Sequence, residues 1–268
     1  MSTDGVDGPE PAAAVAELAD QLGRFRRRYE ADHDSRAVFA FAYASMTRAL
    51  ADRLGRPDHG FDDPVWVADL ATAFGDRYTG AMQAIDADRS EEAATGLDES
   101  VPGPWAAVYR TICLEPSTVL EDLVFSMGAH ITHDLPHALV SVGTESAHLR
   151  DYHRMNEVLA DGTEEIQAAV TTRYNRLFAE LDRLAGGADE ALTNYQIRIG
   201  RSMAWYNALR LQSSGSRAAA SASIERTTPA LIASVRGESR WVMRWPLRLV
   251  RLGLSTRRTW PDNESVTG

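Results

Sequence analysis

The chain has 268 residues, of which 44% are hydrophobic and 25% are charged, and its formal net charge is −10. This length can bury the core of one large domain, and the acidic balance argues against nucleic acid as a partner, because phosphate binding requires clustered cationic groups. A single cysteine excludes an internal disulfide, and no apolar run approaches the roughly 18 residues that span a bilayer. With no signal-peptide pattern at the amino terminus, we expect a soluble, cytoplasmic protein.

Helical spacing of apolar residues recurs along most of the chain, and no segment shows the sustained alternation of a strand. Residues 1–11 are acidic and rich in glycine and proline, which predicts a disordered tail. The predicted fold class is all-α, with a single multi-helix domain over residues 12–212. The expected helices cover residues 12–29, about 35–55, 64–85, 105–113, 116–142, 149–159, 164–184 and 189–212.

The helix expected at residues 116–142 is too apolar to be exposed, so we expect the domain to be built around it as a buried central helix. Pro136 lies inside this helix and lacks a backbone N–H, which predicts a kink or a restart at that point. The positions expected to form the apolar stripe are Leu120, Val124, Met127, Ile131, Leu135, Ala138 and Val142.

The carboxyl-terminal part divides into a linker at 213–216, a basic amphipathic helical section at 217–258 and a tail at 259–268. Residues 236–258 hold seven arginines against one glutamate, interleaved with tryptophan, leucine and valine. Such a segment is suited to peripheral contact with an anionic membrane surface. The more common alternative is a last helix that packs on the domain while its arginines pair with an acidic body.

Three of the seven histidines and one aspartate lie close together on the central helix. At about 100° per residue, His130, His133, Asp134 and His137 fall within roughly a 100° arc, so their side chains can converge. His130 and Asp134, one turn apart, have the spacing of metal ligands, and imidazole with carboxylate also suits acid–base chemistry. The structural alternative is a hydrogen-bonded pair within the packed helix. A restart at Pro136 would move His137 off the shared face.

A second cluster, at residues 148–157, supplies further candidates for the same site. His148 or Asp151 can complete a coordination sphere begun by His130 and Asp134, and the alternative is the solvated, charged start of a helix. Asp34 is another candidate, although it is equally well explained as an N-cap. The predicted metal ligands are His130, Asp134, Asp151, His148 and Asp34, and the predicted catalytic residues are Asp134, His133 and Asp151.

These residues resemble a known group, the domain-of-unknown-function family 5995 of actinobacteria and haloarchaea. The resemblance covers most of residues 34–210, and its most specific part is the central His-Ile-x-x-Asp-Leu-Pro motif that starts at His130. Family members usually have Asn near positions 129 or 132, where this chain has Ala129 and Thr132. The family implies no established activity. The stretches that carry the likeness are 34–41 with Tyr43 and Thr47, 61–64 with Leu70, Phe74, Tyr78 and Ala81, 101–102 with Trp105, 127–136, and 148–159.

Two functional hypotheses follow. A helix with His-x-x-x-Asp also resembles the zinc-binding helices of all-α phospholipase C and single-strand nuclease enzymes, which favours a metal-dependent hydrolase, phosphoesterase-like, that uses zinc or iron to activate water. The alternative is a non-catalytic helical protein that binds an apolar small molecule or lipid, a partner, or an anionic membrane surface. In that case the pair of His130 and Asp134 belongs to a buried hydrogen-bond network.

Overall fold

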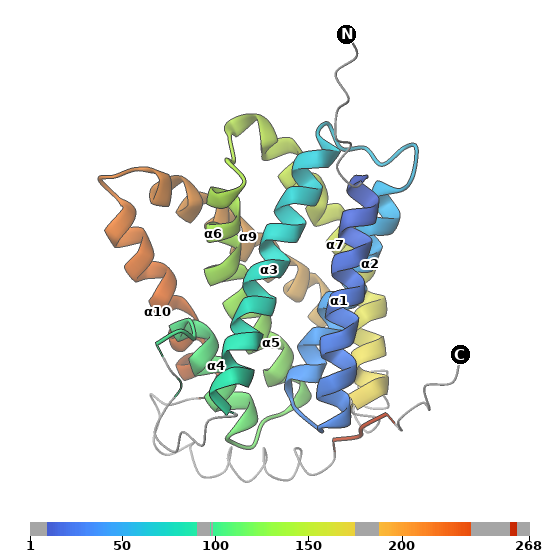
Figure 1. Ribbon diagram of the computed structural model, residues 1–268, viewed down its shortest axis with the longest axis vertical. Helices are drawn as coiled ribbons and strands as arrows, with labels where there is room; N and C mark the ends of the chain where they lie inside the picture. The colour runs from blue at the N-terminus through green and yellow to red at the C-terminus, as the bar shows by residue number, and fades with distance from the viewer. Residues whose placement is uncertain (1–9, 90–96, 98, 175–187, 237–257, 262–268) are drawn as a thin grey trace.

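The structure is a computed structural model that describes residues 10–89, 97, 99–174, 188–236 and 258–261 (Figure 1). Every element within these ranges is helical and none is a strand, which confirms the all-α class. The elements are α1 (Pro11–Ala31), α2 (Arg36–Leu54), α3 (Pro64–Arg89), α4 (Gly103–Cys113), α5 (Val119–Ala129), a π-helical turn (His130–Asp134), α6 (Leu135–Ser141), a 3-10 turn (Ser146–His148), α7 (Leu149–Tyr174), α9 (Ala188–Gln212) and α10 (Arg217–Arg236).

Helices α1 and α2 form a closely packed pair, and α3 lies against α1 (Figure 1). The core of this side is made of aromatic and aliphatic residues that recur once per turn, such as Leu22, Phe25 and Tyr29 of α1. Gly75 of α3 lies so close to α1 that a Cβ atom there would collide with the side chain of Leu18. The absence of a side chain at this position therefore sets the distance between α1 and α3.

The helix predicted at the centre of the domain is present as α5, the π turn and α6, which follow one another without interruption. It is surrounded by α2, α3, α4, α9 and α10. It begins at Val119 rather than at residue 116, because Thr118 and Glu121 form a capping box that satisfies the first free amides. The predicted apolar stripe is only partly right, because Leu120 is 69% exposed while Phe125 and Leu139 are fully buried.

Pro136 does not break this helix. The backbone N–H of Leu135 donates to the carbonyl oxygen of His130, five residues back, which defines the π turn. Pro136 then falls in the first turn of α6, where a missing N–H costs little. The predicted kink or restart is therefore replaced by a local change of helical register immediately before the proline.

The carboxyl-terminal section begins with α10, which packs on α4, α5 and α9, and residues 237–257 lie outside the described part of the chain. Arg236 and Arg258, at the two ends of the basic segment, both contact the core. Arg236 pairs with Glu115 at 2.6 Å, and Arg258 pairs with Asp122 at 2.6 Å. These two arginines follow the packing alternative, and the membrane contact of residues 236–258 stays a prediction.

Trp260, assigned to the tail, lies against the core and stacks on His33 with ring centroids 5.3 Å apart. Residues 1–9 of the predicted amino-terminal tail are not described, and Pro11 already belongs to α1. No helix in the described ranges combines the length and the apolar character needed to cross a membrane.

Candidate functional site

The π turn brings His130, His133 and Asp134 into direct contact. Nδ1 of His130 lies 2.8 Å from Oδ2 of Asp134, and Nδ1 of His133 lies 2.7 Å from Oδ1 of the same carboxylate. A third donor comes from another helix, because Nε1–H of Trp105 donates to Oδ2 of Asp134 over 3.0 Å. All four residues are buried. Asp134 is therefore the acceptor at the centre of a buried cluster, as its position on an apolar helix required.

The charge state of this cluster follows from its surroundings. Burial alone would raise the pKa of Asp134, but the hydrogen bonds from His130 and His133 outweigh burial and hold that pKa below its usual range. Burial lowers the pKa of His130, although Asp134 acts in the opposite direction. Near neutral pH, Asp134 is ionised and His130 is neutral. Because a carboxylate can only accept, Nδ1 of His130 carries the proton, and Nε2 is left with a free lone pair.

His130 is enclosed by aromatic rings. Its imidazole stacks on Phe74, with centroids 3.5 Å apart and planes 7° apart, and meets the ring of Tyr43 edge-on at 4.4 Å. Phe39 and Tyr78 also approach it, at 5.6 and 5.8 Å. Nε2 of His130 and the hydroxyl of Tyr43 are buried and have no hydrogen-bond partner among the described residues. Such unpaired polar atoms are unusual inside a protein, and both belong to residues of the aromatic cage around His130.

A cavity of about 130 Å³ lies beside this aromatic cage. Its walls come from α2, α3, α5, the π turn, α7 and α9, so it occupies the middle of the helix bundle. Aromatic, methionine and aliphatic side chains form nearly all of the lining, including Phe74, Met127 and Met155. His130 and Arg201 are the two lining residues whose side chains carry nitrogen atoms.

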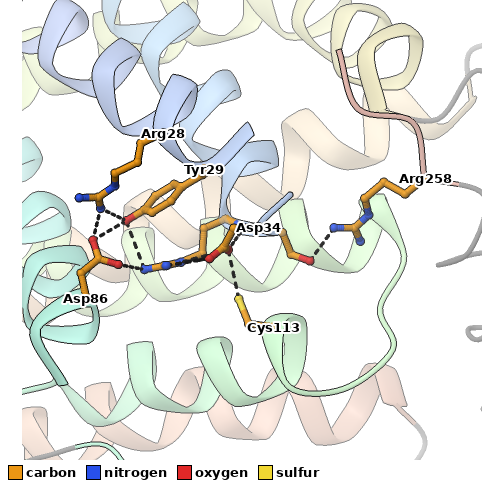
Figure 2. A network of polar contacts seen from close by, with 8 residues as sticks. Arg28, Tyr29, Asp34, Asp86, Cys113 and Arg258 are labelled. Atoms are coloured by element: carbon orange, nitrogen blue, oxygen red, sulfur yellow. Dashed lines mark hydrogen bonds and ion pairs between the residues drawn. The ribbon is translucent and has the colours of Figure 1, made fainter. Parts of the chain in front are cut away.

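Asp34 lies in a different network from the His130 cluster. Its carboxylate is occupied by Arg36, whose Nη2 lies 2.7 Å from Oδ2 and whose backbone N–H donates to Oδ1 over 2.9 Å. Arg36 also donates to Asp86 at 2.8 Å, and Sγ of Cys113 donates to Asp34 over 3.5 Å (Figure 2). The predicted role of Asp34 as a metal ligand beside His130 finds no support here, because Arg36 neutralises this carboxylate inside the junction of α1, α2 and α3.

Asp151 and His148 also lie away from the His130 cluster, at the amino-terminal end of α3. The two oxygens of Asp151 accept the backbone N–H groups of Asp62 and Asp63, over 2.8 and 2.7 Å. His148 stacks on Trp66 with centroids 4.5 Å apart, and its Nδ1 accepts the backbone N–H of Glu145. Asp151 thus ties the start of α7 to the start of α3, which is a structural task. Neither residue has a contact with His130 or Asp134 in the described structure.

The predicted zinc or iron site would be built on His130, Asp134 and their neighbours. Within the described residues, no group of three or more histidine, cysteine, aspartate or glutamate side chains is placed to hold a metal ion. Both oxygens of Asp134 already accept hydrogen bonds, and the nearest further carboxylate to His133 is that of Glu225, whose Oε1 lies 3.4 Å from Nε2. His137 lies beside His133, with ring centroids 5.2 Å apart. The metal therefore stays a prediction, for which these residues supply no coordination sphere.

The residues that surround His130 and Asp134 were not among the sequence candidates. Trp105, Phe74 and Tyr43 lie on α4, α3 and α2, and their contacts with the central helix join positions far apart in the chain. Each is an aromatic residue in an apolar helical pattern, and such a pattern predicts a position in the hydrophobic core. Apolar spacing alone does not separate these rings from the rest of the core, although the family resemblance includes Tyr43, Phe74 and Trp105.

Comparison with known proteins places these observations in a family. The model of a family described as "Family of unknown function (DUF5995)" matches residues 15–236, which include the central helix, the cavity walls and the His130 cluster. The match confirms the resemblance found in the sequence. No curated protein and no solved structure matches the chain.

Proposed function

The chain belongs to the family of unknown function DUF5995, and from this premise we propose that it binds an apolar small molecule in the cavity at the centre of the helix bundle. The observation that carries the proposal is the central cavity, whose mostly apolar wall includes the buried residues His130 and Arg201. Ligand sites typically combine a mostly apolar lining with a few placed polar groups. This arrangement supports the binding alternative.

The size of the cavity supports this proposal. Protein interiors are close-packed, and voids larger than a water molecule are few. Because most of the lining is apolar, the cavity offers water few hydrogen-bond partners and favours an occupant that is largely apolar. In the proposed complex, the apolar part of the ligand packs beside the ring of His130, which Asp134 holds in place.

Two ten-carbon probes, decan-1-ol and decanoate, test the proposal in calorimetric titrations of the full chain below their micelle concentrations. Ala42 lines the cavity from α2, and Ala42→Phe is expected to fill it and weaken the binding of whichever probe binds by at least about tenfold. Ala222→Phe, at an exposed position of α10, is the matched control and should bind like the parent. Met46→Trp is a second filling variant in case Ala42→Phe does not fold. Failure of both probes to bind the parent contradicts the proposal, as does unchanged affinity in both folded filling variants.

A second candidate is the hydrolase, and the observation that favours it is the pair of His130 and Asp134. A neutral imidazole whose Nδ1–H is held by a carboxylate is suited to take a proton at Nε2, and the carboxylate stabilises the imidazolium that forms. Bound zinc or iron is measured by plasma mass spectrometry in the parent, His130→Ala and Asp134→Ala, without a histidine tag. About one equivalent of metal in the parent, lost in both variants, favours the hydrolase. Folded, metal-free parent protein after incubation with either metal opposes it.

A further inference from the structure

Arg201 of α9 is a buried cation in the wall of the central cavity. Its exposed fraction is 3%, and its side chain is held in place by groups of α7. Nε donates to Oδ1 of Asn156 over 2.6 Å, and Nη2 donates to the carbonyl oxygen of Tyr152 over 3.3 Å. The guanidinium also lies over the ring of Tyr152, 4.4 Å from its centroid. All of these partners are neutral, so they orient the charge of Arg201 without compensating it.

The charge of Arg201 has no carboxylate partner in the described part of the chain. Burial lowers its pKa, and Tyr152 is the only group that acts against burial. Nη1 carries two N–H donors, and none of the hydrogen bonds of Arg201 to described residues uses them. An unpaired buried charge is costly, because it loses its hydration without gaining a counter-ion. Nη1 is therefore the group for which an anionic partner is missing.

Among the arginines that the structure describes, three others with buried side chains do have carboxylate partners. Arg36 pairs with Asp34 at 2.7 Å and with Asp86 at 2.8 Å. Arg236 pairs with Glu115 at 2.6 Å, and Arg258 pairs with Asp122 at 2.6 Å. Carboxylates form ion pairs with these three arginines, whereas Arg201 lines the cavity and forms no ion pair with a described residue. The missing partner of Arg201 is thus placed where a ligand would lie.

We propose that the occupant of the cavity is a monoanionic amphiphile, with a carboxylate head bound by Arg201 and an apolar tail enclosed by the aromatic and aliphatic wall. This inference rests on the proposed function and adds the chemical class of the ligand. A single negative charge neutralises the single positive charge of Arg201. A dianionic head would leave excess charge in apolar surroundings, and a neutral head would leave Arg201 uncompensated. A carboxylate also matches the fork of guanidinium N–H donors.

The test compares decanoate with decan-1-ol, which share the tail and differ in the charge of the head. Decanoate is expected to bind the parent at least about tenfold more tightly than decan-1-ol. Arg201→Met, close in volume, should weaken decanoate by at least about tenfold and leave decan-1-ol within about threefold. Arg198→Met removes the same charge from an exposed position of the same helix and should change neither affinity.

The outcomes separate this inference from the proposal beneath it. If decan-1-ol binds the parent as tightly as decanoate, the carboxylate is not recognised, although the cavity still binds apolar molecules. If folded Arg201→Met keeps the affinity of the parent for decanoate, Arg201 is not the anion site. Should Arg201→Met fail to fold, the ratio of the two probes on the parent decides the inference. If neither probe binds the parent, both this inference and the proposed function are wrong.

Discussion

His130 and Asp134 are joined across one turn of the central helix, with 2.8 Å between Nδ1 and Oδ2, and this contact determines which imidazole nitrogen remains available. Nδ1 is engaged, and Nε2 is buried without a partner among the described residues. Because His133 and Trp105 donate to the same carboxylate, Asp134 supports two imidazoles and one indole at once. The orientation of His130 in the cavity wall therefore depends on a single aspartate.

Asp134→Asn should weaken this arrangement at nearly constant volume. The amide has one acceptor oxygen in place of two, and its NH2 group faces an imidazole nitrogen that carries a proton. We expect the free energy of unfolding to fall by about 2 kcal/mol, in the range of a lost hydrogen bond to a charged group. Urea denaturation measures the loss, and Asp52→Asn, at an exposed position of α2, should stay within about 0.5 kcal/mol of the parent. Equal stability of the two variants would contradict the central role of Asp134.

His137 should make stability depend on pH in the weakly acidic range. Burial, together with His133 and Arg77, lowers the pKa of His137 from 6.5 to about 4. As pH falls from 6.5 towards 4, the unfolded chain binds a proton that the folded chain refuses, so the free energy of unfolding decreases. His137→Gln should lose less stability than the parent between about pH 7 and about pH 5, the interval that brackets the ordinary histidine pKa.

Urea denaturation at the two pH values measures this difference. His153→Gln, the same substitution at an exposed position of α7, is the matched control. A parent and a His137→Gln variant with parallel pH dependence would show that His137 is protonated as easily in the folded state as in the unfolded one.

Gly128 of the central helix should not tolerate a methyl group. A Cβ atom at this position would lie 2.6 Å from Cδ2 of Leu231 on α10, so the Leu231 side chain must leave its place in the contact or the two helices must move apart. Overpacking of this kind costs about 1–3 kcal/mol, which exceeds the gain of up to about 1 kcal/mol that alanine brings to a helix. Gly80→Ala in α3 meets no atom within 4 Å and should raise the melting temperature, whereas Gly128→Ala should lower it. The double variant Gly128→Ala/Leu231→Ala should lose less stability than the sum of the losses in the two single variants.

Asp151 should prove structural. Asp151→Ala removes the acceptor of the Asp62 and Asp63 amides and is expected to cost about 1–2 kcal/mol, as for the loss of a helix cap. It should leave the affinity for decanoate unchanged, because Asp151 does not line the cavity. Asp161→Ala, exposed further along α7, is the control for the lost charge. Loss of ligand binding in a folded Asp151→Ala protein would return Asp151 to the functional site.

The sequence predicts what is local in this fold. Apolar spacing locates the helices, and the contact of His130 with Asp134 is predictable because i and i+4 side chains meet on any helix. The role of Asp151 depends on long-range contacts that spacing does not reveal, because its partners are the amides at the start of α3. Asp34 has a local partner, Arg36, two residues along the chain, and the sequence does not show that this pair is buried against Asp86 of α3.

Arg201 is a candidate ligand-binding residue that the apolar spacing of α9 does not predict. An arginine in a helix is usually solvated, and the large apolar residues of α9 suggest where its buried face should lie. In the structure Ile199 and Met203 are 41% and 52% exposed, whereas Ala204 and Ala208 are buried. Small residues allow α9 to approach α6 closely, and this packing turns Arg201 inward. Residue size at a helix contact outweighs hydrophobicity here.

The π turn restricts the number of residues that the central helix can have between α5 and α6. Because it holds one residue more than an α-helical turn, it offsets the face of α6 from that of α5 by about 100°. Phe125 before the turn packs in one core cluster, whereas Leu135 and Leu139 after it pack in another, on a different side of the central helix. Deletion of one residue from 130–134 would rotate α6 as a block and carry its buried face towards solvent. The number of residues in this turn is thus a constraint in its own right, separate from their identities.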